Sequence, residues 1–329
     1  MKPVPVPQAL LDFIITGSKF LLAGHREPDG DCVGSQLALA SALRRLGKEA
    51  IPCSAGPFTR TEIRPYASAY SVRPGNAERE GARVIILDCG SPERLGDLQP
   101  LLRGLPWAVI DHHATGVFAG DSDPLKYLDP DAPATAFMVL KILDALGHDL
   151  NAEEAELLFF ALAMDTGYFR HVDQGGADTF SCAARLIRSG ANPKKVYQAI
   201  YGGKPLASRI LIGRILAGAQ PWYGGKLILC AESLEDNRRY GLEGRDSDSF
   251  YRLLQTVEGM EAAVVIRQES PEKCTLGFRS RNAVDVAAVA AQFGGGGHKN
   301  AAGLSVSGTI EELRPKIIEA FRTIFSENP

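Results

Sequence analysis

The stretch "HREPDGDCVGS", residues 25–35, places His25, Asp29 and Asp31 within seven positions. Imidazole and carboxylate groups bind divalent cations, and crowded carboxylates repel one another unless a positive charge lies between them. Further ionisable side chains come directly after or within apolar runs elsewhere in the chain: Asp88, Asp111, His112 and Asp165. Together, these residue types could hold metal ions.

Each of these residues also has a structural explanation when it is considered alone. Asp29 and Gly30 suit a turn after Pro28, and Asp31 could cap the helix that follows. A single histidine such as His25 is more often a hydrogen-bonded structural residue than a ligand, and the string "DHH" is weak by itself. The metal interpretation therefore depends on whether the fold brings the residues together.

Three apolar segments predict the strands that would do so. The run "KFLLAG", residues 19–24, ends at His25, "ARVIILDCGS" contains an apolar strand ending at Asp88, and "PWAVIDHHAT" contains another ending at Asp111. Helices are expected after the first run, as far as Gly47, and over three further ranges: 133–147, 152–164 and 177–189. Continuously apolar strands that alternate with helices predict a parallel sheet covered on both faces, with ligands bound beyond the carboxyl ends of the strands.

The ionisable residues are therefore expected near one edge of one sheet. They are His25, Asp29, Asp31, Asp88, Asp111, His112 and Asp165. Imidazole with several carboxylates suits manganese, and oxygen-rich sites also accept magnesium, whereas structural zinc more often recruits thiolate. With this many ligands, two ions about 3.5 to 4 Å apart are favoured over one.

The chain is long enough for two domains, because 329 residues exceed the size at which a single core usually splits. We expect an α/β fold with a mainly parallel, Rossmann-like sheet in a larger N-terminal domain, a smaller α/β C-terminal domain, and a cleft between them. The ranges are 1–190, a helical connector over 191–224, and 225–329. The C-terminal strands are expected at "KLILCAE", "AAVVIRQE" and "KCTLGFRSR", followed by a helix around 284–292.

Composition limits the partners. The formal net charge of −3 gives no general basic footprint of the kind that long nucleic acids require. No apolar run is long enough to span a membrane, and the N-terminus lacks the features of a signal peptide, so a cytoplasmic protein without membrane partners is expected. The six cysteines form no CxxC pair and are interpreted as reduced thiols in packing positions.

The glycine run "GGGG", residues 294–297, has two interpretations. It could be a flexible loop, as glycine stretches usually are. Alternatively, the missing side chains let backbone N–H groups approach a phosphate or base, with His298 and Arg279 supplying charge and hydrogen bonds. The metal residues favour the second interpretation.

These segments resemble a known family. "HREPDGDCVGS", "LDCGS", "IDHHAT" and "MDTGYF" are similar, in order and spacing, to the four motifs of the DHH phosphoesterases, and "GFRSR" with "FGGGGHKNAAG" resembles the DHH-associated C-terminal domain. Within the family, the two-domain length is similar to that of bacterial enzymes that degrade very short oligonucleotides and dephosphorylate 3′-phosphoadenosine 5′-phosphate. The resemblance spans nearly the whole chain.

The resemblance implies a role for each matching residue. His25 and Asp29 would hold one ion, Asp31, His112 and Asp165 the other, and Asp88 would bridge them. Asp111 would orient the histidines, and His113 would face the substrate phosphate. The C-terminal candidates for substrate binding are Arg279, Ser280, Arg281, Gly296, Gly297 and His298, with Asn282 and Asn300 as weaker ones. Cys32 and Cys89 stand beside ligands where the family often has other small residues, which raises a question of oxidation sensitivity.

The expected function is that of a manganese-dependent phosphoesterase, with two Mn²⁺ or, as a substitute, Mg²⁺. It would hydrolyse short RNA or DNA oligonucleotides to mononucleotides and, as the resemblance implies, dephosphorylate the mononucleotide bisphosphate. The nearest alternative is a phosphodiesterase for cyclic or linear dinucleotide second messengers. A family II pyrophosphatase, a RecJ-type exonuclease and a nucleotide sensor without catalysis fit these residues less well. A homodimer is compatible with the sequence.

Overall fold

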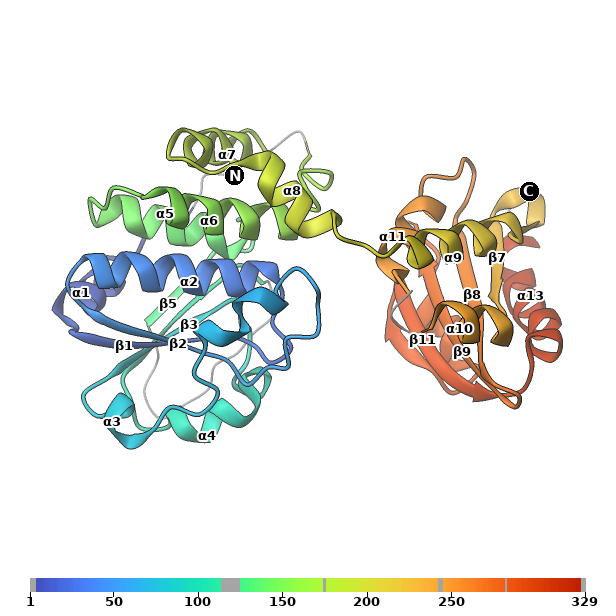
Figure 1. Ribbon diagram of the computed structural model, residues 1–329, viewed down its shortest axis with the longest axis horizontal. Helices are drawn as coiled ribbons and strands as arrows, with labels where there is room; N and C mark the ends of the chain where they lie inside the picture. The colour runs from blue at the N-terminus through green and yellow to red at the C-terminus, as the bar shows by residue number, and fades with distance from the viewer. Residues whose placement is uncertain (1–3, 114–124, 174–175, 242–244, 282, 327–329) are drawn as a thin grey trace. The chain divides into compact units, whose positions relative to one another are not determined.

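The computed structural model describes residues 4–113, 125–173, 176–241, 245–281 and 283–326. The chain divides into two compact units, Met1–Gly203 and Lys204–Pro329 (Figure 1). The expected connector, 191–224, is divided between them. Its first helix, α8 (Pro193–Tyr201), buries Val196 and Ile200 in the first unit, whereas α9 (Leu206–Ala217) packs on a strand of the second.

The first unit is built on five parallel strands in the order β2-β1-β3-β4-β5. The strands are β1 Lys19–Ala23, β2 Glu49–Cys53, β3 Arg83–Leu87, β4 Trp107–Asp111 and β5 Leu125–Leu128. Because β1, β3 and β4 are adjacent and parallel, their carboxyl ends lie side by side at one edge. The predicted parallel sheet is confirmed, and the strands at 49–53 and 125–128 are additions to it.

Helices cover both faces of this sheet, as the alternating pattern predicts (Figure 1). Their bounds are α1 Gln8–Thr16, α2 Gly30–Arg45, η1 Arg64–Ala69, α3 Asn76–Arg79, η2 Pro92–Leu98, α4 Gln99–Leu102, α5 Thr135–Ala145, α6 Ala152–Asp165 and α7 Ala177–Arg188. The larger core lies between the sheet and α1, α2, α5 and α6, whereas a smaller one lies under η2 and α4. The helices expected over 133–147, 152–164 and 177–189 are α5, α6 and α7.

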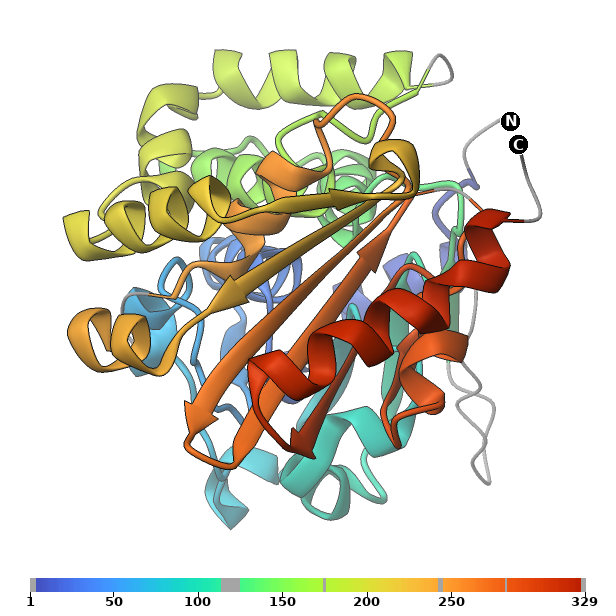
Figure 2. The ribbon, with the colours of Figure 1, turned by 90° about the vertical axis from the view of Figure 1, so that its right-hand side faces the viewer.

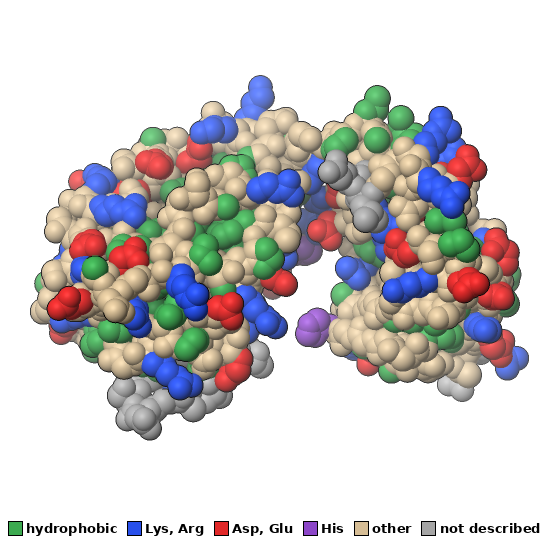
Figure 3. Space-filling view, turned by 60° about the horizontal axis from the view of Figure 1, so that its bottom comes forward, with side chains coloured by type: hydrophobic (Ala, Val, Ile, Leu, Met, Phe, Trp, Pro, Cys, Tyr) green, Lys and Arg blue, Asp and Glu red, His purple; other side chains and the backbone are tan. Residues whose placement is uncertain are grey.

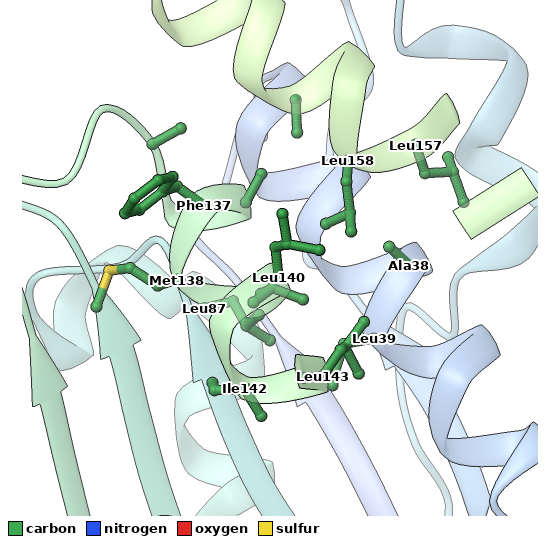
Figure 4. Packing of buried hydrophobic residues seen from close by; sticks show 14 of the residues in the cluster. Ala38, Leu39, Leu87, Phe137, Met138, Leu140, Ile142, Leu143, Leu157 and Leu158 are labelled. Carbon is green, nitrogen blue, oxygen red and sulfur yellow. The ribbon is translucent and has the colours of Figure 1, made fainter. Parts of the chain in front are cut away.

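Close packing of α2, α5 and α6 positions the polar residues at their ends. Figure 4 shows Ala38 and Leu39 of α2, Leu140 and Leu143 of α5 and Leu158 of α6 gathered in one apolar cluster. Gly34 allows α2 and α6 to approach each other, because a Cβ atom there would lie 2.5 Å from the carbonyl oxygen of Leu157. The two helices therefore run close together.

The second unit is a six-stranded mixed sheet in the order β10-β11-β9-β8-β7-β6. Its elements are β6 Gln220–Trp222, η3 Tyr223–Gly225, β7 Leu227–Glu232, α10 Leu234–Tyr240, α11 Ser247–Leu254, β8 Ala262–Ser270, β9 Lys273–Ser280, α12 Val286–Ala291, β10 Gly296–His298, β11 Ala301–Ser307 and α13 Ile310–Ser326. Figure 2 shows α13 lying across one face, where it shares a core with α12, and α9 and α11 share a core with the other face. The predicted smaller α/β C-terminal domain is confirmed.

The glycine run is partly an edge strand. Gly296, Gly297 and His298 form β10, which pairs antiparallel with β11, so that the simple-loop interpretation does not describe these residues.

Among the helices that the structure describes, none is long and apolar enough to cross a membrane.

Candidate metal centre

The carboxyl ends of β1, β3 and β4 carry the ionisable residues that the sequence singled out. His25 follows β1, Asp88 follows β3, and Asp111 ends β4. Asp88 has a positive φ of 55°, an uncommon backbone conformation for a residue other than glycine. It is 1% exposed and so directs a charged side chain into a buried position. Such an arrangement is expected only where a cation or hydrogen-bond donors compensate the charge.

A first group of donor atoms surrounds the ring of His25. Its Nε2 lies 3.8 Å from Oδ2 of Asp29 and 3.7 Å from Oδ2 of Asp88. The other ring nitrogen, Nδ1, lies 2.8 Å from the carbonyl oxygen of Arg26, to which it can only donate. A neutral His25 therefore presents the lone pair of Nε2 to the two carboxylates, as a metal ligand requires.

A second group surrounds His112. Its Nε2 lies 3.9 Å from Oδ2 of Asp31, 3.6 Å from Oδ1 of Asp88 and 3.5 Å from Oδ2 of Asp165. The Nδ1 atom lies 3.2 Å from the carbonyl oxygen of Ala132 and donates to it. Nε2 is buried and has no hydrogen-bond partner among the described residues. A buried nitrogen that has no partner among the described residues and faces three carboxylate oxygens has the surroundings expected of a metal ligand.

Asp88 belongs to both groups. One of its oxygens faces His25 and the other faces His112. Ligand atoms that share an ion at about 2.1 Å are roughly 3 to 4 Å apart, and the donor separations of 3.5–3.9 Å fall in this range. Oxygen and imidazole donors suit Mg²⁺ and Mn²⁺. The residues present therefore fit a pair of hard divalent cations that share Asp88.

Backbone donors hold the two aspartates of α2 in place. Asp29 caps the helix, since its Oδ1 accepts hydrogen bonds from the N–H groups of Asp31 and Cys32, which leaves Oδ2 to face His25. Asp31 accepts from the N–H groups of Thr135 at 2.6 Å and Ala136 at 3.0 Å, at the start of α5. The N-terminal end of α5 thus supplies partial positive charge to a fully buried carboxylate.

The crowding of charge perturbs these groups strongly. Burial, and then the nearby Asp88 and Asp165, raise the pKa of Asp31 well above its ordinary value. Burial also raises the pKa of Asp165, to about 6. Burial alone would lower the pKa of His25, but its contacts with Asp29 and Asp88 raise it to about 10. Without a cation, the cluster therefore retains protons that divalent ions would displace.

Asp111 and His113 form a separate pair. Oδ1 of Asp111 accepts hydrogen bonds from Nδ1 of His113 at 2.7 Å and from its backbone N–H at 3.2 Å. This hydrogen bond, opposed by burial, raises the pKa of His113. The expectation that Asp111 orients both histidines needs correction, because the carbonyl group of Ala132 holds His112. The side chain of His113 is 39% exposed and can reach a ligand.

The two cysteines beside the ligands are buried. Cys32 and Cys89 are both 0% exposed, and burial raises the pKa of each thiol. Sγ of Cys32 and donor atoms of His25 and Asp88 all lie within 4.8 Å of one another. The thiol is thus close to the first group of donors, but it remains protonated more readily than an ordinary cysteine.

The candidate substrate residues of the second unit are separated by the alternation of strand β9. Arg279 is half-buried, and it shares a sheet face with His298, because both lie in register with Ala301 of β11. Ser280 points to the opposite face, is 4% exposed, and donates its hydroxyl to the carbonyl oxygen of Val284 at 2.7 Å. The expectation that Ser280 binds substrate is therefore corrected, since its hydroxyl is used inside the unit.

The remaining candidates lie at the surface. Arg281, Gly296, Gly297, His298 and Asn300 are all exposed, and Asn282 lies outside the described residues. Gly297 has a φ of +148°, and a Cβ atom there would lie 2.4 Å from the carbonyl oxygen of Ala301. Gly296 has open space at its Cβ position. Only Gly297 is thus required by the packing of the strand itself.

Comparison with known proteins gives the same division of the chain. Residues 19–162 match the DHH family, N-terminal domain, and residues 228–327 match the DHHA1 domain. The bifunctional oligoribonuclease and PAP phosphatase NrnA of Thermus thermophilus is 33% identical over 302 residues, which are 92% of this chain and 88% of the relative. The chain belongs to the DHH family.

Two other similar proteins extend the comparison. The cyclic-di-AMP phosphodiesterase GdpP of Geobacillus thermodenitrificans is 25% identical over 335 residues; the match covers 97% of this chain but about half (50%) of that relative. An exopolyphosphatase-related protein from Bacteroides fragilis has a similar structure, with a TM-score of 0.81 and 20% identity, and the match covers 97% of this chain and 98% of the other. That similarity shows that the two-unit DHH fold is shared.

Two residues of this DHH protein were missed in the sequence. Thr135 donates its hydroxyl to Oδ1 of Asp88 at 3.2 Å and its N–H to Asp31. Tyr251, in α11, lies beneath the guanidinium group of Arg279. Neither residue stands in a motif with recognisable spacing, so no signal in the sequence distinguishes them from ordinary core and helix residues.

Proposed function

We propose that the chain is a manganese-dependent phosphoesterase that hydrolyses very short oligonucleotides to mononucleotides and removes the 3′-phosphate of 3′-phosphoadenosine 5′-phosphate. The observation that carries the proposal is the pair of donor groups joined by Asp88. The choice of substrates is supported by the relative of 33% identity, which is named as an oligoribonuclease and PAP phosphatase. The match covers 88% of that relative.

The donor residues divide into two sets in this proposal. His25 and Asp29 hold one ion, Asp31, His112 and Asp165 hold the second, and Asp88 binds both. Bound divalent cations would lower the pKa of a water molecule and stabilise the charge that develops on phosphoryl oxygens. The carbonyl groups of Arg26 and Ala132 keep the two histidine rings in the orientation that ligation requires.

His113 is the residue that contacts the substrate phosphate in this proposal, and Asp111 orients it. Asp111 holds Nδ1 of His113 as a donor, so that a protonated ring directs Nε2–H towards a phosphoryl oxygen. Because the hydrogen bond to Asp111 raises the pKa of His113, the ring is cationic over a wider pH range. A positioned donor of this kind stabilises negative charge more in the transition state than in the ground state.

The second unit supplies the nucleotide-binding groups. Arg279 and His298 share one face of its sheet, with Ala301 between them, and Gly296, two residues before His298, has open space at its Cβ position. On the face that Figure 3 shows, Lys and Arg are interspersed with Asp and Glu on both units and form no extended basic track. The net charge of −3 agrees with this. Such a surface suits a terminal nucleotide better than a long strand.

Two alternatives remain distinguishable. Hydrolysis of cyclic or linear dinucleotides would need the same metal centre. The relatives named as cyclic-di-AMP phosphodiesterases are less similar to this chain, at 25% and 24% identity, and the match covers only about half of their length. A nucleotide sensor without catalysis would have no need for the full donor set.

A turnover panel tests the proposal. Purified protein with Mn²⁺ or Mg²⁺ is assayed against dinucleotides, five-nucleotide RNA and DNA, long single strands, the bisphosphate, cyclic dinucleotides and pyrophosphate. We expect the highest kcat/KM for substrates of two to about five nucleotides, because further nucleotides find no basic track. Asp88→Asn, purified in parallel, excludes a contaminating nuclease. Equal rates on long strands, or faster turnover of cyclic dinucleotides or pyrophosphate, would overturn the substrate assignment.

A further inference from the structure

Tyr251 occupies an unusual position in the second unit. It lies in α11, is 5% exposed, and its ring centroid is 4.5 Å from Cζ of Arg279. The guanidinium group of Arg267 is also near this side chain, with its Cζ 5.9 Å from the ring centroid. Gly277, two residues before Arg279 on β9, leaves room for the phenol, because a Cβ atom there would lie 2.1 Å from Oη of Tyr251. The contact with Arg279 is thus made by the ring.

Three arginines of the second unit differ in their partners. Arg245 pairs with Glu232 and Glu269, at 2.7 and 3.0 Å, and Arg267 pairs with Glu232 at 3.2 Å. Arg279 has no acidic partner among the described residues; its polar contact is with the carbonyl oxygen of Phe278. Of these three guanidinium groups, therefore, only that of Arg279 keeps an uncompensated positive charge.

An aromatic face can hold a guanidinium group without neutralising it. A carboxylate would fix Arg279 as well, but it would also cancel the charge that a phosphate needs. Arg279 and His298 are two strands apart on the same face, about 9 to 10 Å at ordinary strand spacing, with Ala301 between them. A free arginine side chain has many rotamers, and its restriction before binding lowers the entropy lost when a ligand arrives.

We propose that Tyr251 is a positioning residue, whose ring holds the charged side chain of Arg279 ready for a substrate phosphate. The proposal rests on the proposed function, in which Arg279 binds the nucleotide. Tyr251 acts through Arg279 and does not contact the substrate. Its ring, and not its hydroxyl, carries the effect.

Three variants separate the ring, the hydroxyl and the surrounding core. Tyr251→Leu removes the aromatic face, Tyr251→Phe keeps it, and Phe250→Leu is a matched control. Phe250 is 2% exposed in the same core, and no guanidinium group of the described residues lies over its ring. We expect Tyr251→Leu to raise the KM for a dinucleotide about three- to tenfold, with kcat less affected. Tyr251→Phe should keep the wild-type KM, and Phe250→Leu should change thermal stability without changing KM.

A double-mutant cycle with Arg279→Ala distinguishes an effect of Tyr251 that acts through Arg279 from a purely structural effect. Once Arg279 is absent, Tyr251→Leu should raise KM no further. The dissociation constant of AMP, measured by calorimetry, should follow the same pattern. Additive effects of the two substitutions, or a Tyr251→Phe variant as impaired as Tyr251→Leu, would overturn the inference. If the wild type neither cleaves dinucleotides nor binds AMP, the proposed function fails and the inference fails with it. If the wild type turns over normally and the Tyr251→Leu variant has the same KM, the inference alone is refuted.

Discussion

Asp88 offers one oxygen to each group of donors, so its replacement should affect both ions at once. Asp88→Asn keeps the size of the side chain, and asparagine tolerates the positive φ of 55° at this position. The fold should therefore survive. A neutral amide has only one carbonyl oxygen and cannot bridge two cations, so at most one weakened site should remain.

Binding of the two ions should raise the thermal stability of the folded protein. An ion present at about 100 times its dissociation constant stabilises the folded state by roughly 2.7 kcal/mol, so two saturated sites should contribute about 5 kcal/mol. The first unit spans Met1–Gly203, and for this size each kcal/mol raises Tm by about 2 to 4 °C. Mn²⁺ should thus raise the Tm of the wild type by about 10 to 20 °C, and that of Asp88→Asn by less than about half as much.

Thermal unfolding with chelator and with Mn²⁺, together with metal analysis of the dialysed protein, measures this difference. His113→Ala is the matched control: its Nδ1 is already bonded to Asp111, so the variant should keep both ions and the full shift while losing rate. His112→Ala should lose metal. A Tm shift in Asp88→Asn equal to that of the wild type, or equal metal loss in the two histidine variants, would refute the assignment of the donors.

Four other substitutions test the surrounding structure. Ser280→Ala should lower the free energy of unfolding in urea by about 1 kcal/mol and leave KM unchanged, since its buried hydroxyl serves Val284. Gly297→Ala should destabilise the second unit, whereas Gly296→Ala should keep stability and raise the KM for dinucleotides. Burial alone would raise the pKa of Glu154, but hydrogen bonds from Asn151, His148 and Ser41 hold it below its usual value. The loss of folding free energy in Glu154→Gln should therefore become smaller as the pH falls below about 4.5.

The sequence predicts the identity of the donor residues better than their orientation. His25, Asp88 and Asp111 follow from apolar runs that end on polar side chains, since parallel strands bring such ends together. The partners that orient the histidines are carbonyl groups of Arg26 and Ala132. Every residue has a carbonyl group, so no pattern of side chains could indicate them.

In the second unit, the geometry of a strand separates two of the expected substrate residues. Successive side chains of a strand point to opposite faces, so Arg279 and Ser280 in "GFRSR" cannot both face one ligand. The apolar pattern located β7, β8 and β9, but the edge strand β10 consists of two glycines and a histidine and has no strand signal. It forms because β11 leaves its outer hydrogen-bonding groups for a partner, which is a property of the sheet and not of the segment.

The arrangement of hydrogen bonds explains how so many like charges can share one buried site. In Asp29, one carboxylate oxygen is used by N–H groups of α2 and the other faces His25. In each metal-facing histidine, one nitrogen is used by a carbonyl group and the other faces the carboxylates. Each side chain is thereby fixed by the backbone through one atom and offers another to a cation. Because the orienting partners belong to the first turn of α2 and to the backbone at Arg26 and Ala132, the donor groups are already oriented before the ions bind, and less free energy is spent on ordering them.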